Sequence, residues 1–218
     1  MKGFPATIVL ATTNDHKAAE LAEVLEEAGI RTRVAAHGAE LQEDGFVTLL
    51  TRPGGVPAVE ETAPDFEGNA RLKAWALADA TGLPALADDS GLEVDHLGGA
   101  PGVRSARFAG EDADDLANVS RLLGELEELE EGDPRRRARF RCVVVLAIPG
   151  EPPVVASGTV EGRIVAEPRG AAGFGYDPVF VPDGADGRTF AEMSAPEKNA
   201  ISHRGRALRS LVTRLGRS

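Results

Sequence analysis

The chain has 218 residues, with 24 Lys+Arg against 35 Asp+Glu and a formal net charge of -11 at pH 7. Its 42% hydrophobic and 27% charged residues are typical of a globular protein with a sizeable core. The single cysteine excludes a disulfide framework, and the longest apolar run (143–148) is too short to cross a membrane. The acidic balance argues against tight, non-specific binding of nucleic acid. We therefore expect a cytoplasmic protein with neither a membrane nor a nucleic-acid partner.

Strand and helix patterns alternate along the chain, which predicts an α/β fold. Residues 7–11 have the apolar run of a buried strand, and 15–28 have the periodicity of an amphipathic helix. Residues 37–60 contain several glycines and prolines without a steady period, so we expect a long loop excursion there. A second helix is predicted over 69–81, where glycine and proline follow.

The second half of the chain continues the alternation. Short strands are predicted at 85–88 and 92–95, joined by a turn at 89–91. The acidic stretch 111–133 predicts an amphipathic helix with a solvated face. In the next predicted strand, Phe140, Cys142 and Val144 alternate with arginines, which we expect at the sheet edge. A further strand is predicted at 154–160. The chain is expected to end in a helix with one apolar face, formed by Leu208, Leu211, Val212 and Leu215.

The first stretch with candidate functional residues leads from the first predicted strand into the first predicted helix. Free backbone N–H groups and the helix dipole favour an anion at such a position. Thr12, Thr13 and Asn14 add donors, and Lys17 adds a compact positive charge. Helix capping alone also explains Thr and Asn here, and no Walker loop occurs in the chain.

Two further stretches concentrate acids and a lysine. Lys73 falls one helical turn after Asn69, so both side chains project from the same side of the second helix. Asp88 and Asp89 follow an apolar strand directly, where burying two acids requires a cation or hydrogen bonds. An Asx turn through Ser90 is the structural alternative, but a turn does not need two adjacent acids.

A glycine-rich stretch at 170–178 surrounds an aromatic residue, which lets a flat ligand approach the backbone and stack. Residues 202–204 could cap the last helix or contribute donors. The chain has four lysines, and Lys17, Lys73 and Lys198 all fall within the stretches that contain these candidate residues.

Taken together, five stretches resemble the Ham1-like inosine/xanthosine triphosphate pyrophosphatase family and occur in that family's order. They are LATTNDHKAAEL, FEGNARLKA, LPALADDSGLEVDHLGGAPGVRSARFAG, GFGYDPVF and EKNAISHRG, and they extend over residues 10–205. The resemblance implies an α/β, two-lobed mixed-sheet Maf/Ham1-like (ITPase-like) fold with a central substrate cleft. It implies a single domain over 1–218 and a homodimer.

The resemblance also implies an activity: Mg2+-dependent hydrolysis of dITP/ITP and XTP/dXTP to the monophosphate and pyrophosphate. It makes Asp89 the proton acceptor and, together with Glu61, a metal ligand. The implied substrate contacts are Thr12, Thr13, Asn14, Asp15, His16, Lys17, Lys73, Ser90, Phe174, Gly175, Tyr176, Asp177, Lys198, His203 and Arg204.

Two departures and three alternatives accompany this interpretation. Gly68 stands where the family often has an acid, so Glu67 is one position away from the expected place and is not counted as a metal ligand. The stretch 37–60 is also longer than in compact members of the family. The alternatives are a Maf-like pyrophosphatase acting on pyrimidine or modified triphosphates, an aspartyl-phosphate phosphatase and a catalytically silent nucleotide sensor. Aspartyl-phosphate chemistry requires acids separated by one residue, whereas the acids at 88 and 89 are adjacent.

Overall fold

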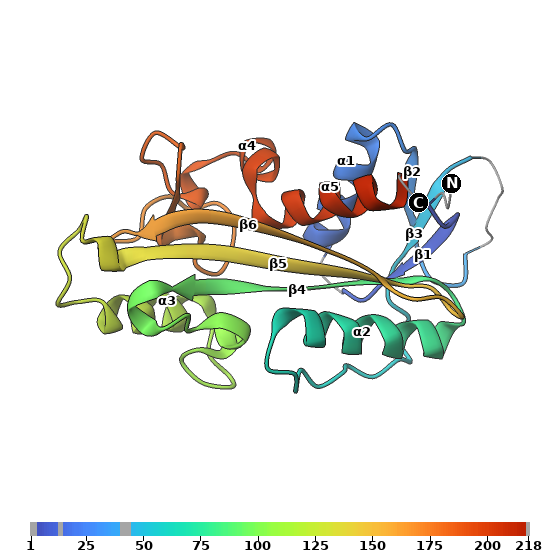
Figure 1. Cartoon of the computed structure of the whole chain (residues 1–218), viewed down its shortest axis with the longest axis horizontal. Coiled ribbons are helices and arrows are strands. Elements are labelled where there is room, and N and C mark those ends of the chain that lie inside the picture. The colour runs from blue at the N-terminus through green and yellow to red at the C-terminus, as the bar shows by residue number, and fades with distance from the viewer. Residues whose placement is uncertain (1–3, 13–14, 40–44, 217–218) are drawn as a thin grey trace. The chain divides into compact units, whose positions relative to one another are not determined.

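The computed structural model describes residues 4–12, 15–39 and 45–216. Within them, seven strands form one sheet in the order β2-β3-β1-β4-β5-β6-β7 (Figure 1). Parallel and antiparallel pairs coexist in the sheet, which confirms the mixed α/β fold. The strands are β1 (Thr7–Leu10), β2 (Thr32–Ala35), β3 (Val47–Leu50), β4 (Ala85–Val94), β5 (Arg137–Ala147), β6 (Val154–Ile164) and β7 (Phe180–Pro182), and the α-helices are α1 (Asp15–Glu27), α2 (Phe66–Thr81), α3 (Asp115–Glu125), α4 (Ala195–Ile201) and α5 (His203–Gly216).

The chain divides into two compact units. The first unit comprises Met1–Asp89, Val143–Gly158 and Gly205–Ser218, and the second comprises Ser90–Cys142 and Thr159–Arg204. Strands β4, β5 and β6 each contribute residues to both units.

The first unit is built on parallel strands. β1 pairs in parallel with both β3 and β4, and β3 pairs in parallel with β2. Helix α2 lies on one side of these strands and α1 and α5 lie on the other (Figure 1). Because both faces are covered at β1, this strand is a continuous apolar run, and its residues Ile8, Val9 and Leu10 are almost completely buried.

An aromatic cluster forms the core of the second unit. The ring of Phe140 lies 4.8 Å from that of Phe180 and 5.9 Å from that of Phe190, measured between centroids. Leu122 of α3 is fully buried in the same cluster. The acidic stretch 111–133 therefore contributes a helix with a buried apolar side, as predicted, although the helix is confined to Asp115–Glu125.

The stretch 37–60, expected to be a long loop excursion, contains strand β3. Strand β2, just before this stretch, was also not predicted. Both strands have only four residues, and each is held by backbone pairing to a partner distant in sequence, such as Thr7 opposite Thr48. Four residues carry too little periodicity to reveal a strand without its neighbours.

The predicted turn at 89–91 is wrong. Residues 85–94 form one continuous strand, β4, in which Gly91 is buried and does not adopt a positive φ. The N–H of Leu92 donates to the Ser105 hydroxyl at 2.9 Å, so this part of the strand is fixed by a partner thirteen positions away. Sheet pairing and this contact override the local turn preference of Asp-Ser-Gly.

Three smaller differences concern element boundaries and charges. Helix α2 begins at Phe66, three residues before the predicted start, because the Asp65 carboxylate caps it by accepting from Gly68 N–H at 2.7 Å. Strand β6 extends to Ile164. The arginines expected at a sheet edge lie on an inner strand, because β5 lies between β4 and β6, and Arg139 and Arg141 form ion pairs with Glu93 of β4. Arg136, just before β5, is only 3% exposed and donates to the backbone carbonyls of Leu126, Leu129 and Val165.

The sequence analysis expected no segment long enough to cross a membrane. Among the helices that the structure describes, none is long and apolar enough to cross a membrane.

Candidate active site

The acids at 88 and 89 lie where the parallel strands of the first unit end. Leu10, the last residue of β1, stands opposite Leu86 of β4, and the N–H of Ala11 donates to the Leu86 carbonyl at 2.8 Å. β4 continues past this point, so Asp88 and Asp89 extend beyond the carboxyl end of β1. Ligand sites in α/β folds commonly form at this end of the strands. The sequence analysis expected the two acids to follow the end of a strand, whereas they lie within β4, beside the carboxyl end of β1.

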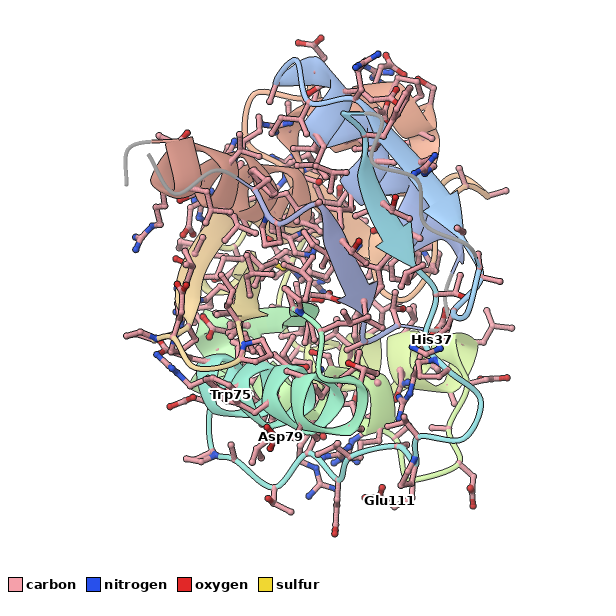
Figure 2. The ribbon with its side chains drawn as sticks, turned by 90° about the vertical axis from the view of Figure 1, so that its right-hand side faces the viewer. His37, Trp75, Asp79 and Glu111 are labelled. Atoms are coloured by element: carbon pink, nitrogen blue, oxygen red, sulfur yellow. The ribbon has the colours of Figure 1, made fainter. Side chains whose placement is uncertain are left out.

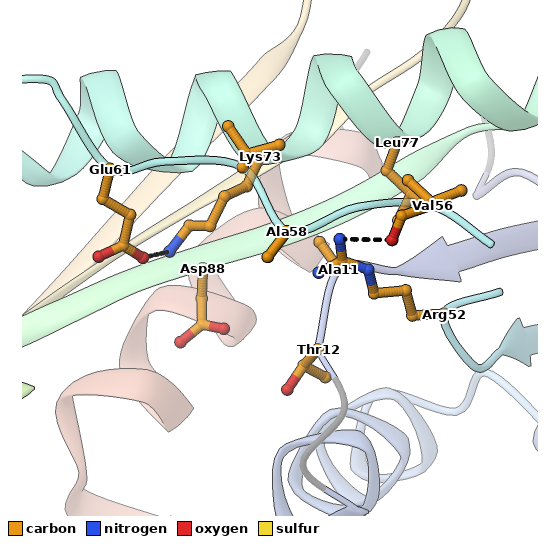
Figure 3. A pocket seen from close by; sticks show the side chains of 10 residues that line it. Ala11, Thr12, Arg52, Val56, Ala58, Glu61, Lys73, Leu77 and Asp88 are labelled. Atoms are coloured by element: carbon orange, nitrogen blue, oxygen red, sulfur yellow. Dashed lines mark hydrogen bonds and ion pairs between the residues drawn. The ribbon is translucent and has the colours of Figure 1, made fainter. Parts of the chain in front are cut away.

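The ammonium group of Lys73 lies between two carboxylates. Its Nζ donates to Glu61 Oε1 at 2.8 Å and to Asp89 Oδ1 at 2.9 Å. Asn69, one turn earlier on α2, is fully buried and donates to Asp89 Oδ2 at 3.3 Å. Figure 3 shows Lys73 reaching from α2 to Glu61. The prediction that Asn69 and Lys73 share one side of a helix is confirmed, since both hold the same carboxylate.

Burial and charge act against each other in this cluster. Burial raises the pKa of Asp89 above its usual value, and the attraction of Lys73 opposes this effect. Burial also acts to lower the pKa of Lys73, but Asp89 and Glu61 outweigh it and raise that pKa above its usual value. The lysine is therefore held as a cation between the two acids.

The same carboxylates could hold a divalent cation. Among the described residues there is no group of three or more His, Cys, Asp or Glu side chains able to hold a metal ion. Magnesium, however, is usually bound through one or two carboxylates, with water and substrate phosphate as its other ligands. Glu61 and Asp89 already converge on one cation, the Lys73 ammonium, and their oxygens are the hard donors that magnesium prefers.

A cavity of about 250 Å³ lies beside this cluster in the first unit (Figure 3). Thr12, Lys73, Glu61 and Asp88 are among the residues that line it. Thr12 therefore lies at a pocket, as its candidate role requires. Thr13 and Asn14 fall outside the described residues, as do the side chains of Asp15, His16 and Lys17, although the backbone from Asp15 onward is helical in α1.

Glu67 lies on the surface. It is half exposed and forms an i,i+4 ion pair with Arg71 at 2.7 Å. At Gly68, an added Cβ would lie 2.5 Å from the Ala63 methyl group and 3.2 Å from the Asp65 carboxylate. Glycine is therefore required by the way the segment before α2 packs against the first turn of the helix.

The second unit contains a buried ion pair beneath an exposed aromatic ring. Asp177 is 2% exposed and accepts hydrogen bonds from Lys198 Nζ at 2.5 Å and from Phe174 N–H at 2.9 Å. Burial raises the pKa of Asp177 above its usual value, against the opposing effect of Lys198. The Phe174 ring is 43% exposed, with Lys198 Nζ 4.8 Å and Arg204 Cζ 5.8 Å from its centroid. Both cations lie over the ring and are buried, so they hold Phe174 in place while the exposed part of the ring can still contact a flat group.

Other predicted contacts of the second unit are largely buried. His203 stacks on Phe140, with ring centroids 4.7 Å apart and an interplanar angle of 9°. Arg204 donates to the Ser90 hydroxyl at 3.4 Å. The Tyr176 hydroxyl donates to the Ser105 carbonyl at 2.8 Å, which turns this side chain toward the core of its own unit.

Two residues at these sites were not predicted from the sequence. Arg52 lines the cavity of the first unit, and it lies in the stretch expected to be a plain loop. Asp115, in the first turn of α3, accepts from Gly175 N–H at 2.7 Å and so fixes the glycine-rich segment beside Phe174. Neither residue belongs to a recognisable motif, and their proximity to the sites arises from contacts across the fold.

Comparison with known proteins shows which family the chain matches. The model of the Ham1 family matches residues 8–214. A dITP/XTP pyrophosphatase of Bacillus licheniformis is 47% identical over 204 residues, covering 94% of this chain and 95% of that protein. Another of the same name from Shigella flexneri is 46% identical over 211 residues, covering 95% of this chain and 97% of that protein.

Solved structures agree with the sequence comparison. A HAM1 protein from Coxiella burnetii has a TM-score of 0.80 and 41% identity, covering 97% of this chain and 99% of that chain. The Staphylococcus aureus Ham1 protein has a TM-score of 0.79 and 35% identity, covering 97% of this chain and all of the other. With a family match over nearly its whole length and relatives of almost equal extent, the chain belongs to the Ham1 family.

Proposed function

We propose that this protein hydrolyses non-standard purine nucleoside triphosphates, dITP/ITP and XTP/dXTP, to the monophosphate and pyrophosphate, with Mg2+ as cofactor. The observation that carries the proposal is the Lys73 ammonium held between Glu61 and Asp89 at the edge of a pocket. Relatives of equal length that bear the name dITP/XTP pyrophosphatase support the substrate class.

The first unit supplies the groups for the triphosphate. Glu61 and Asp89 would hold the magnesium ion, which when bound neutralises negative charge on the phosphate oxygens. A chain with a net charge of -11 needs such neutralisation to accept a triphosphate. Lys73 would move from its carboxylate partners toward the phosphates, and Thr12 together with 13–17 would supply further donors at the start of α1.

Asp89 accepts the proton in the proposed reaction. A water oxygen forms a bond to the α-phosphorus, its proton passes to the Asp89 carboxylate, and the bond from the α-phosphorus to the bridging oxygen breaks. The bridging oxygen keeps the electron pair and leaves as pyrophosphate. Asn69 and Lys73 fix the orientation of the carboxylate through hydrogen bonds to its two oxygens.

The second unit supplies the groups for the base. Phe174 would stack on the purine. The Asp177 carboxylate, which accepts from Lys198, also accepts from the backbone N–H of Phe174 and so holds this residue in place. Donors from His203 and Arg204 would match the 6-oxo group of hypoxanthine and xanthine. Adenine has an amino donor at that position, which would leave buried donors unsatisfied at a cost of about 1–3 kcal/mol each.

Two further properties remain predictions from the sequence. We propose a homodimer, which sedimentation or light scattering would test, and a location in the cytoplasm, where the free nucleotide pool is found.

The decisive experiment measures pyrophosphate and orthophosphate released from dITP, XTP, GTP and ATP, with Mg2+ and with EDTA. We expect pyrophosphate from dITP and XTP only when Mg2+ is present, and little from GTP or ATP. Orthophosphate as the direct product would instead show attack at the γ-phosphorus. Binding of dITP without turnover would indicate a nucleotide sensor, and turnover of pyrimidine triphosphates alone would indicate a Maf-like activity.

A further inference from the structure

Arg52 lines the cavity of the first unit together with Thr12 and Lys73 (Figure 3). It lies two residues after β3, at the start of a turn that contains two glycines. Its Nη2 donates to the backbone carbonyls of Val56 at 3.0 Å and Pro57 at 2.5 Å. These two bonds fix the guanidinium plane at the cavity wall.

Arg52 and Lys73 differ in the partners of their charged groups. Lys73 is shared by two carboxylates, whereas every contact of Arg52 with the described residues goes to a neutral carbonyl oxygen. Arg52 therefore brings to the cavity a positive charge that is not engaged in an ion pair with a described carboxylate, although Glu61 and Asp88 line the same cavity. Guanidinium groups present several donors in one plane, which suits the paired oxygens of phosphates.

The size of the cavity indicates which part of a nucleotide fits. At about 250 Å³ it is smaller than the ~300–1,000 Å³ of pockets that enclose whole drug-sized ligands. Its lining combines Arg52, Thr12 and Lys73, which can donate to phosphate oxygens, with the carboxylates of Glu61 and Asp88, which suit the proposed Mg2+. The aromatic ring assigned to the base belongs to the second unit. The cavity therefore suits a phosphate group better than a purine.

We infer that Arg52 binds the β- and γ-phosphates of the nucleotide and, after cleavage, the pyrophosphate. This inference rests on the proposed function. As the bond between the α-phosphorus and the bridging oxygen breaks, the electron pair and the negative charge pass to the pyrophosphate, and the Arg52 guanidinium stabilises that charge. Since phosphoryl transfer is catalysed largely by such electrostatic stabilisation, Arg52 acts on kcat as well as on phosphate binding.

The test compares R52Q with the wild type and with R71Q. Glutamine keeps a polar side chain with N–H donors, although a shorter one, and removes the charge. Arg71 is an exposed residue of α2 paired with Glu67, so R71Q removes the same charge from the same unit away from the cavity. The measured quantities are kcat with dITP and the inhibition constants for pyrophosphate and dIMP, with thermal unfolding as the check of folding.

For R52Q we expect the pyrophosphate inhibition constant to rise about 10- to 100-fold, with kcat lowered by a similar factor, because charge-assisted hydrogen bonds to phosphate are lost. The dIMP constant should change less than about twofold, since the monophosphate lacks the groups that Arg52 binds, and R71Q should resemble the wild type. An unchanged pyrophosphate constant in folded R52Q would overturn the inference, as would an equal loss of dIMP binding.

Two further measurements keep the outcome clear. If R52Q does not fold, R52K replaces it: retention of pyrophosphate inhibition within about tenfold supports the role of charge, and complete loss in a folded R52K contradicts it. If the wild type fails to hydrolyse dITP, the proposed function fails by itself. Calorimetric titration of pyrophosphate with Mg2+ into the wild type and R52Q then still decides whether Arg52 is a phosphate ligand.

Discussion

The contacts of single residues explain why Lys73 is a lysine in a chain that otherwise favours arginine. A compact ammonium can donate to Glu61 and Asp89 at once, at 2.8 and 2.9 Å, from a single nitrogen. Asn69 satisfies the other oxygen of Asp89. An uncompensated buried carboxylate would be costly, so this arrangement stabilises the acid that the reaction is proposed to use.

Replacing Asp89 by asparagine should abolish most of the turnover. D89N keeps the size of the side chain but removes the proton acceptor and one of the two carboxylates that hold Lys73. We expect kcat for dITP to fall by about 10²–10⁴, the range typical of a lost general base. Steady-state kinetics of pyrophosphate release measures the loss.

E67Q is the matched control for D89N. Glu67 lies on the surface in an ion pair with Arg71, and its carboxylate is not part of the cluster. Its activity should change less than about twofold, as expected for an exposed pair. A D89N enzyme as active as E67Q would show that the base is elsewhere.

The glycines beside Phe174 allow a second comparison of single residues. Gly173 and Gly175 both have positive φ, so alanine is strained at either position. At Gly173, however, an added Cβ would lie 2.1 Å from the Asp177 carboxylate, whereas nothing lies within 4 Å at Gly175. G173A would therefore displace the carboxylate that holds Lys198 and the Phe174 N–H.

We expect KM for dITP to rise at least about tenfold in G173A and by less than about threefold in G175A, since only the former disturbs hydrogen bonds to a charged group. Michaelis–Menten kinetics of both variants measures the difference. Equal effects would show that backbone strain, and not the position of Asp177, governs binding of the base.

At the scale of the elements, capping side chains determine where the helices begin. Helix α4 carries Lys198 and starts with a capping box, in which the Glu197 carboxylate accepts from the Ser194 N–H at 2.8 Å and from the Ser194 hydroxyl at 2.7 Å. Glu197 also pairs with Arg188 at 3.1 Å. The hydrogen bonds from Ser194 and then Arg188 lower the pKa of Glu197 from 4.5 to about 2.

This shift predicts how stability depends on pH. The folded state holds the Glu197 proton more weakly than the unfolded state, so the carboxylate stabilises the fold fully above about pH 4.5, and this contribution is lost as the pH falls toward about 2. Glutamine preserves the capping box without the charge. The stability advantage of the wild type over E197Q should therefore shrink between these pH values, as urea unfolding at several pH values would measure. A difference independent of pH would contradict the prediction.

For the whole molecule, the two compact units share their longest strands. β4, β5 and β6 are neighbours in the sheet, and each crosses from one unit into the other along the chain. Unfolding one unit would interrupt three strands midway, with loss of the ladder hydrogen bonds there. We therefore expect both units to unfold together.

The chain contains a natural pair of probes for this prediction, one tryptophan and one tyrosine. Trp75 lies on α2, where Figure 2 labels it together with Asp79, and α2 belongs to the first unit. Tyr176 is buried in the second unit. Trp75 fluorescence and Tyr176 ultraviolet absorbance should give the same urea midpoint. Separate midpoints would show that the units unfold independently.

The sequence by itself determined the α/β class, the longer helices, the family resemblance and most of the candidate residues. These features depend on periodicity and on motifs within a few positions of one another, such as Asn69 and Lys73 on one side of α2.

The tertiary structure alone decided that 85–94 is one strand, that β2 and β3 exist, that Arg136 is buried, and that Arg52 lines the same cavity as Lys73. In each case the deciding contact joins segments distant along the chain or depends on burial. Leu92 is fixed by Ser105, β3 by β1, and Arg136 by carbonyls up to 29 positions away. Local preference is weak compared with such pairing, so a residue's neighbours in sequence could not reveal these features.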